Sequence, residues 1–190
     1  MSTELVRGQN LALPDTRVEV EVSAQCPVEL VVALVGADDR VRGDDDVLQR
    51  GGTDTAGVTI RQSGATFELD KLPADVERVL VAASLEGGGV DRFGVVAAPV
   101  TTVRAAGEDL ATFRIADLGS ERALHTVELY RRQGAWKVRA VGQGYEAGLE
   151  ALLKDVGVQN RARVVDRART ALGGAGAAPF SAANAPTEPR

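Results

Sequence analysis

The sequence predicts an all-β, mainly antiparallel protein: a two-sheet β-sandwich with a short C-terminal helix, then an additional helix and a disordered tail. Short β-prone runs recur along the chain between clusters of turn-forming residues. Apolar residues change to helical spacing only after Tyr145. These two observations give a sandwich domain over residues 1–158, an amphipathic helix over 159–173 and a disordered tail over 174–190.

The first two long strands show different patterns. Arg17 to Val22 reads RVEVEV and alternates strictly, which is typical of a strand with one buried face. Val28 to Val35 reads VELVVALV, is apolar on both faces, and ends at the turn formers of GADD. The second run therefore predicts a central strand.

The remaining strands are predicted by shorter runs of β-branched and aromatic residues. They cover Gly57–Gln62, Thr66–Leu69, Arg78–Leu85, Val95–Val103 and Leu110–Ile115. The last pair, Thr126–Tyr130 and Trp136–Val141, flanks a short connection in which Gly134 can adopt a positive φ. This pair predicts a β-hairpin.

Two helical patterns follow the hairpin. Leu149, Leu152, Leu153 and Val156 have helical spacing, and Gly157 can cap the helix. After Asn160 a second helix is expected, with an apolar face and four arginines on the remainder. Its apolar residues are Val164, Val165, Ala168 and Leu172, and its arginines are Arg161, Arg163, Arg167 and Arg169. Beyond it, the Gly, Ala and Pro content cannot offset the entropy of ordering the chain.

Composition narrows the class of partner and the compartment. The 190 residues carry a net charge of -5, which disfavours nucleic acid as a partner because nucleic acids attract basic surfaces. Cys26 is the single cysteine, so a reducing compartment fits best. The opening residues lack the apolar run of a signal peptide, and no run is long enough to insert into a membrane. We expect a cytoplasmic protein.

Motifs for catalysis are weak. His125, the single histidine, has no nucleophile motif near it, which favours a structural histidine over a general base. The glycines of Gly142–Gly148 have the wrong spacing for a nucleotide-binding loop and suggest a tight strand-to-helix connection. The arginine-bearing helix could bind an acidic partner or present a solvated face. We expect no enzyme.

Asp44, Asp45 and Asp46 form the most concentrated acidic cluster, with Asp38 and Asp39 nearby. Calcium requires several oxygen ligands that converge on it, and three adjacent carboxylates cannot all point the same way. A weak metal site and a solvated acidic loop both remain open.

Distinctive motifs stand at the two ends of the chain. The opening reads Leu5-Val6-Arg7-Gly8-Gln9-Asn10, with Leu13 a little further on. The closing segments, from Glu128 to Leu149, read ELYR, GAWKVRAVGQGY and GL, and Phe93-Gly94 lies between the two ends. These motifs resemble the TerD family of tellurium resistance and general stress proteins, whose opening pattern is L-x-K/R-G-Q-N. The resemblance covers about Leu5 to Val158.

The resemblance implies a β-sandwich, calcium binding by acidic loops and a role in resistance to tellurite and other stresses. The family's D-L-D motif stands here as Glu29-Leu30-Val31, and its later acidic loop has no counterpart between Gly57 and Leu69. The metal ligands that the resemblance leaves are Glu29, Asp44 and Asp46. We therefore expect at most weak binding of Ca²⁺ and no other cofactor.

Three functions follow. The favoured one is a non-catalytic stress-response module that acts through protein partners, including other Ter-type stress proteins. The alternative is a calcium-binding TerD domain protein. An enzyme acting on tellurite is least favoured, because reduction needs a redox cofactor or paired thiols and the sequence offers neither.

Overall fold

The computed structural model describes residues 1–52 and 55–174. The tail predicted over residues 174–190 lies outside the described residues, apart from Gly174, which is the last residue of a helix.

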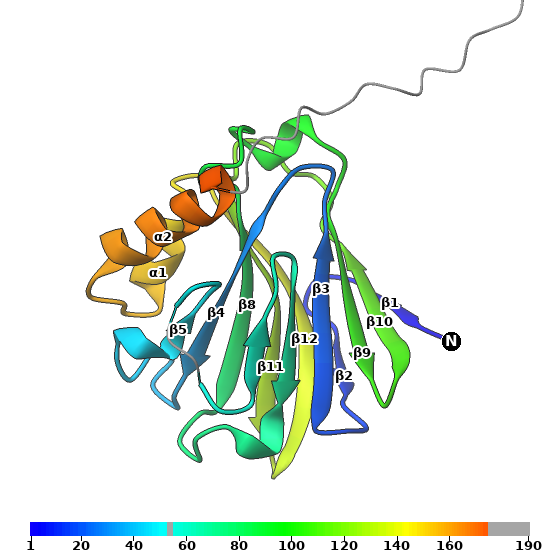
Figure 1. Ribbon diagram of the computed structural model, residues 1–190. Coiled ribbons are helices and arrows are strands. Elements are labelled where there is room, and N and C mark those ends of the chain that lie inside the picture. The colour runs from blue at the N-terminus through cyan, green and yellow to red at the C-terminus, as the bar shows by residue number, and fades with distance from the viewer. Residues whose placement is uncertain (53–54, 175–190) are drawn as a thin grey trace, which may run out of the picture.

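Two six-stranded sheets pack face to face, and two helices cover the outer face of one of them (Figure 1). The first sheet contains, in order, β1 (Thr3–Leu5), β10 (Glu108–Arg114), β9 (Val100–Ala105), β3 (Arg17–Ser23), β7 (Gly64–Glu68) and β6 (Val58–Ile60). The second contains β2 (Asn10–Ala12), β12 (Ala135–Tyr145), β11 (Ala123–Arg132), β8 (Arg78–Ser84), β4 (Glu29–Val35) and β5 (Val47–Leu48). All neighbours are antiparallel except β1 and β10. The predicted all-β sandwich is confirmed.

Strand β3 shows why the alternating pattern predicts one buried face. Val18, Val20 and Val22 are buried in the core between the sheets, and Glu21 on the other face is exposed. Side chains of a strand alternate between its two faces, so the sequence pattern maps directly onto burial.

Strand β4 is buried on both faces, as its continuous apolar run predicts. Leu30, Val32 and Leu34 lie in the core between the sheets. Val31, Ala33 and Val35 belong to a second core on the outer face of the same sheet. The second core explains why this strand has no polar face.

The helices α1 (Leu149–Asp155) and α2 (Arg161–Gly174) complete the second core. Leu149, Leu152 and Leu153 of α1 and Val164 and Ala168 of α2 pack there. Both helices were predicted from the sequence, but the predicted architecture had only the two sheet layers. The structure has a third layer, because β4 and its neighbours present apolar side chains outside the sandwich as well.

The predicted hairpin forms between β11 and β12, and both strands are longer than expected. Gln133 and Gly134 have φ values of 52° and 75°. Two consecutive positive φ angles define the two-residue turn whose twist matches that of paired strands. The Arg131 guanidinium lies 5.0 Å from the ring centroid of Trp136, which is half-buried at this end of the sandwich.

Several boundaries differ from the predictions. Gly142 and Gly144 lie within β12 rather than in a connection, and Gly142 adopts φ 65° where the register with β11 shifts. The predicted strand Val95–Val103 begins only at Val100, after the short 3₁₀ helix η3 (Phe93–Val95). Two more such turns are η1 (Asp44–Asp46) and η2 (Leu69–Lys71). The short strands β1, β2 and β5 were not predicted.

Candidate functional site

Glu29, the first of the predicted metal ligands, is fully buried at the start of β4. Its carboxylate accepts hydrogen bonds from Arg50, from Nη2 at 2.7 Å and Nε at 3.1 Å, both to Oε2. Burial raises the pKa of Glu29, and the Arg50 guanidinium offsets only part of that effect. Arg50 also donates to the Ala171 carbonyl of α2 at 3.3 Å. Glu29 is therefore one end of an internal ion pair.

Asp46 and Asp44 are engaged in different ways. Asp46 accepts two hydrogen bonds of 2.7 Å from the Arg42 guanidinium and a third from the Arg42 backbone at 3.0 Å. Asp44 accepts from the backbone amides of Gln159 at 2.8 Å and Asn160 at 2.9 Å. Asp44 thus holds the segment that leads into α2.

The structure does not bring these three carboxylates together. Within residues 1–52 and 55–174, no group of three or more His, Cys, Asp or Glu side chains is arranged to hold a metal ion. Glu29 and Asp46 each face a guanidinium, and Asp44 faces backbone amides. The arrangement therefore does not supply the converging oxygens that a calcium ligand set needs.

Calcium should accordingly bind weakly at most. We expect chelator-stripped protein to give no saturable heat at micromolar calcium, because calcium needs roughly six to eight oxygens and these carboxylates already have partners. Isothermal titration measures this directly. A stoichiometric micromolar isotherm that Asp44→Ala or Asp46→Ala abolishes and Asp45→Ala preserves would contradict the expectation.

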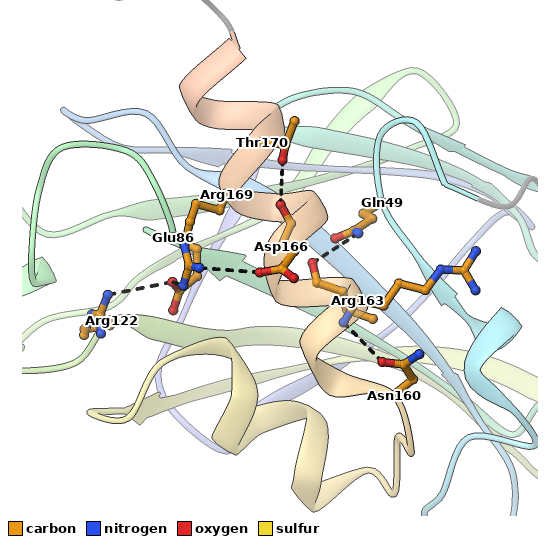
Figure 2. A network of polar contacts seen from close by, with 9 residues as sticks. Gln49, Glu86, Arg122, Asn160, Arg163, Asp166, Arg169 and Thr170 are labelled. Carbon is orange, nitrogen blue, oxygen red and sulfur yellow. Dashed lines mark hydrogen bonds and ion pairs between the residues drawn. The ribbon is translucent and has the colours of Figure 1, made fainter.

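A polar network joins α2 to the sandwich (Figure 2). The buried carboxylate of Glu86 lies 3.4 Å from Arg169 Nη2 and 3.7 Å from Arg122 Nη2. Gln49 donates to the Val164 carbonyl at 3.3 Å. One arginine of the predicted arginine-bearing helix thus turns towards a buried acid on the sandwich.

Asn160 caps the start of α2. Its side-chain oxygen accepts from the backbone amide of Arg163 at 3.3 Å. The first amides of a helix have no partner within the helix, so a side chain at this position stabilises its beginning. Near the other end, Thr170 donates its hydroxyl to the Asp166 carbonyl at 2.8 Å (Figure 2).

A pocket of about 450 Å³ lies on the outer face of the second sheet, beside α1. Glu128 on β11 is buried there and forms ion pairs with Arg139 of β12 and, at 3.6 Å, with Arg78 of β8. Arg78 also pairs with Asp39 in the loop after β4. We call these four residues, Asp39, Arg78, Glu128 and Arg139, the charged network.

His125 lines the same pocket. It is 6% exposed, and its Nε2 has no hydrogen-bond partner among the described residues. Burial, with a contribution from Arg78 and Arg139, lowers its pKa to about 3. The prediction of a structural histidine on a strand agrees with this neutral, buried side chain.

The charged network was not predicted from the sequence. Glu128 offered a usable signal, because it is the one acid within the strand-forming run ALHTVELY. A buried acid on a central strand requires a partner. The partners, Arg78 and Arg139, could not be identified without knowing that β8 and β12 flank β11.

A larger groove of about 840 Å³ lies beside β1, at the edge of the first sheet. Val6, Phe113, Ile115 and Leu118 line it, and Val6 is 60% exposed. Unlike an isolated exposed side chain, Val6 lies in a groove with further apolar lining, and this combination marks a candidate contact surface.

The fold and these features define a β-sandwich domain with a helical layer on one sheet. The chain belongs to the TerD family, since the model of the TerD domain matches residues 1–156. Helix α2 follows the matched region. No helix in the described part of the chain is long and apolar enough to cross a membrane.

Curated relatives carry resistance and stress names. Tellurium resistance protein TerD of Alcaligenes sp is 28% identical over 145 residues, which cover 66% of this chain and 74% of the relative. General stress protein 16U of Bacillus subtilis (strain 168) is 26% identical over 122 residues, covering 62% of this chain and 63% of the relative.

Solved structures share the fold. A homologue of telluride resistance protein (TerD) from Streptomyces coelicolor A3(2) gives a TM-score of 0.59 at 19% identity, covering 72% of this chain and 94% of that one. The crystal structure of a second protein, described as of unknown function, gives a TM-score of 0.61 at 17% identity. The match covers 76% of this chain and 98% of that one. These structures support the fold, and the match to the TerD domain confirms the predicted family.

Proposed function

We propose that this protein is a non-catalytic, cytoplasmic stress-response module that acts by binding other proteins, including Ter-type stress proteins. Its family membership and the names of its relatives support the stress role. The surface beside β1 is the observation on which we base the proposal that the protein acts through a protein partner.

That surface combines an exposed apolar side chain with a free sheet edge. Among residues 1–52 and 55–174, β1 pairs only with β10, so its other edge offers backbone groups to an extended segment. Val6 directly follows β1, and the groove beside it is rimmed by charges of both signs, including Glu4, Arg7 and Arg114. An apolar centre with a polar rim is typical of protein interfaces.

The single histidine and the single cysteine of the chain, residue types that often act in catalysis, both support the proposal that the protein is not an enzyme. Burial and neighbouring arginines lower the pKa of His125 to about 3, far from the range in which a histidine exchanges protons at neutral pH. Burial raises the pKa of the Cys26 thiol, which disfavours the reactive thiolate.

The test is capture of purified Ter-type stress proteins by immobilised protein. We expect Val6→Glu to weaken capture by about tenfold or more, because it places a charge at the apolar centre of the contact. Surface plasmon resonance gives the dissociation constants.

Val95→Glu is the matched control, since Val95 is 59% exposed, lies in η3 and is not among the residues that line the groove. Retained binding by Val95→Glu with loss in Val6→Glu supports the proposal. Equal binding by both variants and the unmodified protein, or no binding by any Ter-type protein, contradicts it.

A further inference from the structure

The helical layer leaves the turn end of the β11–β12 hairpin uncovered (Figure 1). The second core includes Ala123 of β11, and Tyr145 of β12 packs against it; both lie at the strand ends farthest from the turn. Near the turn, Leu129 of β11 points into the core between the sheets. Because side chains alternate along a strand, the next residue, Tyr130, points outward from the sandwich.

Cationic side chains surround Tyr130 on this outer face. The register places Arg78 of β8 directly beside it on one side and Lys137 of β12 on the other. Residues opposite one another on neighbouring strands share a face and have side chains within reach of each other. The Arg139 guanidinium lies 5.4 Å from the centroid of the Tyr130 ring, and Arg132 follows Tyr130 by two residues on the same face of β11. We call these five residues the Tyr130 patch.

Two of the four cations in the Tyr130 patch are neutralised within the fold and two are not. Arg78 and Arg139 belong to the charged network, in which two arginines and two acids cancel. Arg132 is exposed and Lys137 half-buried, and neither forms an ion pair or a side-chain hydrogen bond with any residue that the structure describes. The patch therefore carries two positive charges without carboxylate partners, in a chain whose net charge is -5.

The Tyr130 patch also has the composition and the rigidity of a contact surface. Tyrosine and arginine are enriched where proteins bind one another. The Tyr130 ring is half-buried, so part of it remains available to a partner. A tyrosine has two side-chain torsions, and this one is fixed on a central strand, so binding would cost little conformational entropy.

We propose that the Tyr130 patch binds an acidic segment of a partner protein, with Tyr130 as the central contact and Arg132 and Lys137 as its charge partners. Carboxylates complement the two cations that the fold leaves without one. A nucleic acid is disfavoured, because a strand extending beyond the patch would meet the surface of an acidic chain. The patch shares no residue with the groove beside β1, so it is a second, separate contact surface.

The test measures binding of a short, fluorescently labelled peptide to the full chain by fluorescence anisotropy. Glutamates flank one central phenylalanine in this peptide, because aromatic side chains pack favourably on a tyrosine ring. We expect saturable binding that weakens as salt is added, since the attraction is between exposed charges. A matched peptide with lysines in place of the glutamates should not bind.

Arg132→Gln combined with Lys137→Gln tests the charge partners. We expect this double variant to bind the glutamate peptide about tenfold more weakly, because the loss of one exposed ion pair is roughly a threefold effect. Arg17→Gln combined with Lys154→Gln is the matched control. Arg17 is exposed on β3 of the other sheet and Lys154 is exposed in α1, so this control removes the same charge elsewhere and should retain binding.

Tyr130→Thr tests the central contact. Threonine retains the preference for a strand but removes the ring, so we expect binding to weaken by about fivefold or more. Thermal unfolding shows whether the variant remains folded. Unchanged binding by a folded Tyr130→Thr variant contradicts Tyr130 as the central contact, and the double variant tests the proposal independently of it.

Three results would overturn the proposal. The first is no saturable binding of the glutamate peptide. The second is equal weakening by the patch variant and its control, because the effect would then reflect net charge alone. The third is tighter binding of a single-stranded RNA oligonucleotide than of the peptide, which would identify a nucleic-acid surface.

Discussion

Replacing Arg50 by methionine should destabilise the protein by about 3 to 5 kcal/mol at neutral pH, the usual effect of removing one partner of a buried ion pair. The Glu29 side chain is 1% exposed and would keep its charge without the hydrogen bonds that Arg50 donates to it. Methionine retains most of the aliphatic volume, so the loss reflects charge rather than packing. Urea denaturation gives the difference in the free energy of unfolding.

The pH dependence identifies Glu29 as the cause. Without Arg50, the folded-state pKa of Glu29 should rise further above its unfolded value of 4.5. A raised carboxyl pKa means that the folded protein binds the proton more tightly than the unfolded chain. The destabilisation of Arg50→Met should therefore be greatest above the folded-state pKa and shrink as the pH falls.

Two further variants are controls. Glu29→Gln combined with Arg50→Met removes both charges and should recover part of the lost stability. Lys71→Met breaks the exposed pair with Glu68 and should cause no measurable change. A fully stable Arg50→Met variant would show that Glu29 finds another partner or is neutral in the native protein.

Acidification should destabilise the protein through His125. The histidine has a pKa of 6.5 in the unfolded chain and about 3 when folded, so between these values the unfolded chain binds the additional proton. The free energy of unfolding should then fall with decreasing pH by up to about 1.4 kcal/mol per unit across this window. Above pH 6.5 this contribution is fully present and constant.

His125→Gln isolates the effect. It removes the titrating group while retaining a polar side chain, and the carboxylates titrate alike in both proteins. Urea denaturation at a series of pH values should show the stability difference between the two proteins narrowing as the pH falls from 6.5 towards 3. Parallel curves for the two proteins would refute the depressed pKa.

Strong periodic patterns predicted the central parts of the fold. The alternation of β3, the doubly apolar run of β4 and the Gly134 turn each predicted an element that the structure contains. The strands β1 and β2 have three residues each and β5 has two, which is too short for a period to show. Their pairing depends on neighbours that are distant in the sequence.

The candidate site was less predictable for the same reason. Acidic residues could be recognised, but their partners could not: Arg50 follows Glu29 by 21 residues, and Asn160 follows Asp44 by 116. A carboxylate in a sequence does not indicate whether it will face a metal, a guanidinium or a backbone amide. Only the fold decides between these environments.

The double-sided burial of β4 has a consequence for synthesis on the ribosome. Ala171, whose carbonyl binds Arg50, follows it by 121 residues, so the apolar outer face of β4 is made long before α2. At the usual speed of translation this interval is on the order of 10 s. During that time the nascent chain presents Val31, Ala33 and Val35 to solvent, and chaperones that bind apolar stretches would have a target there.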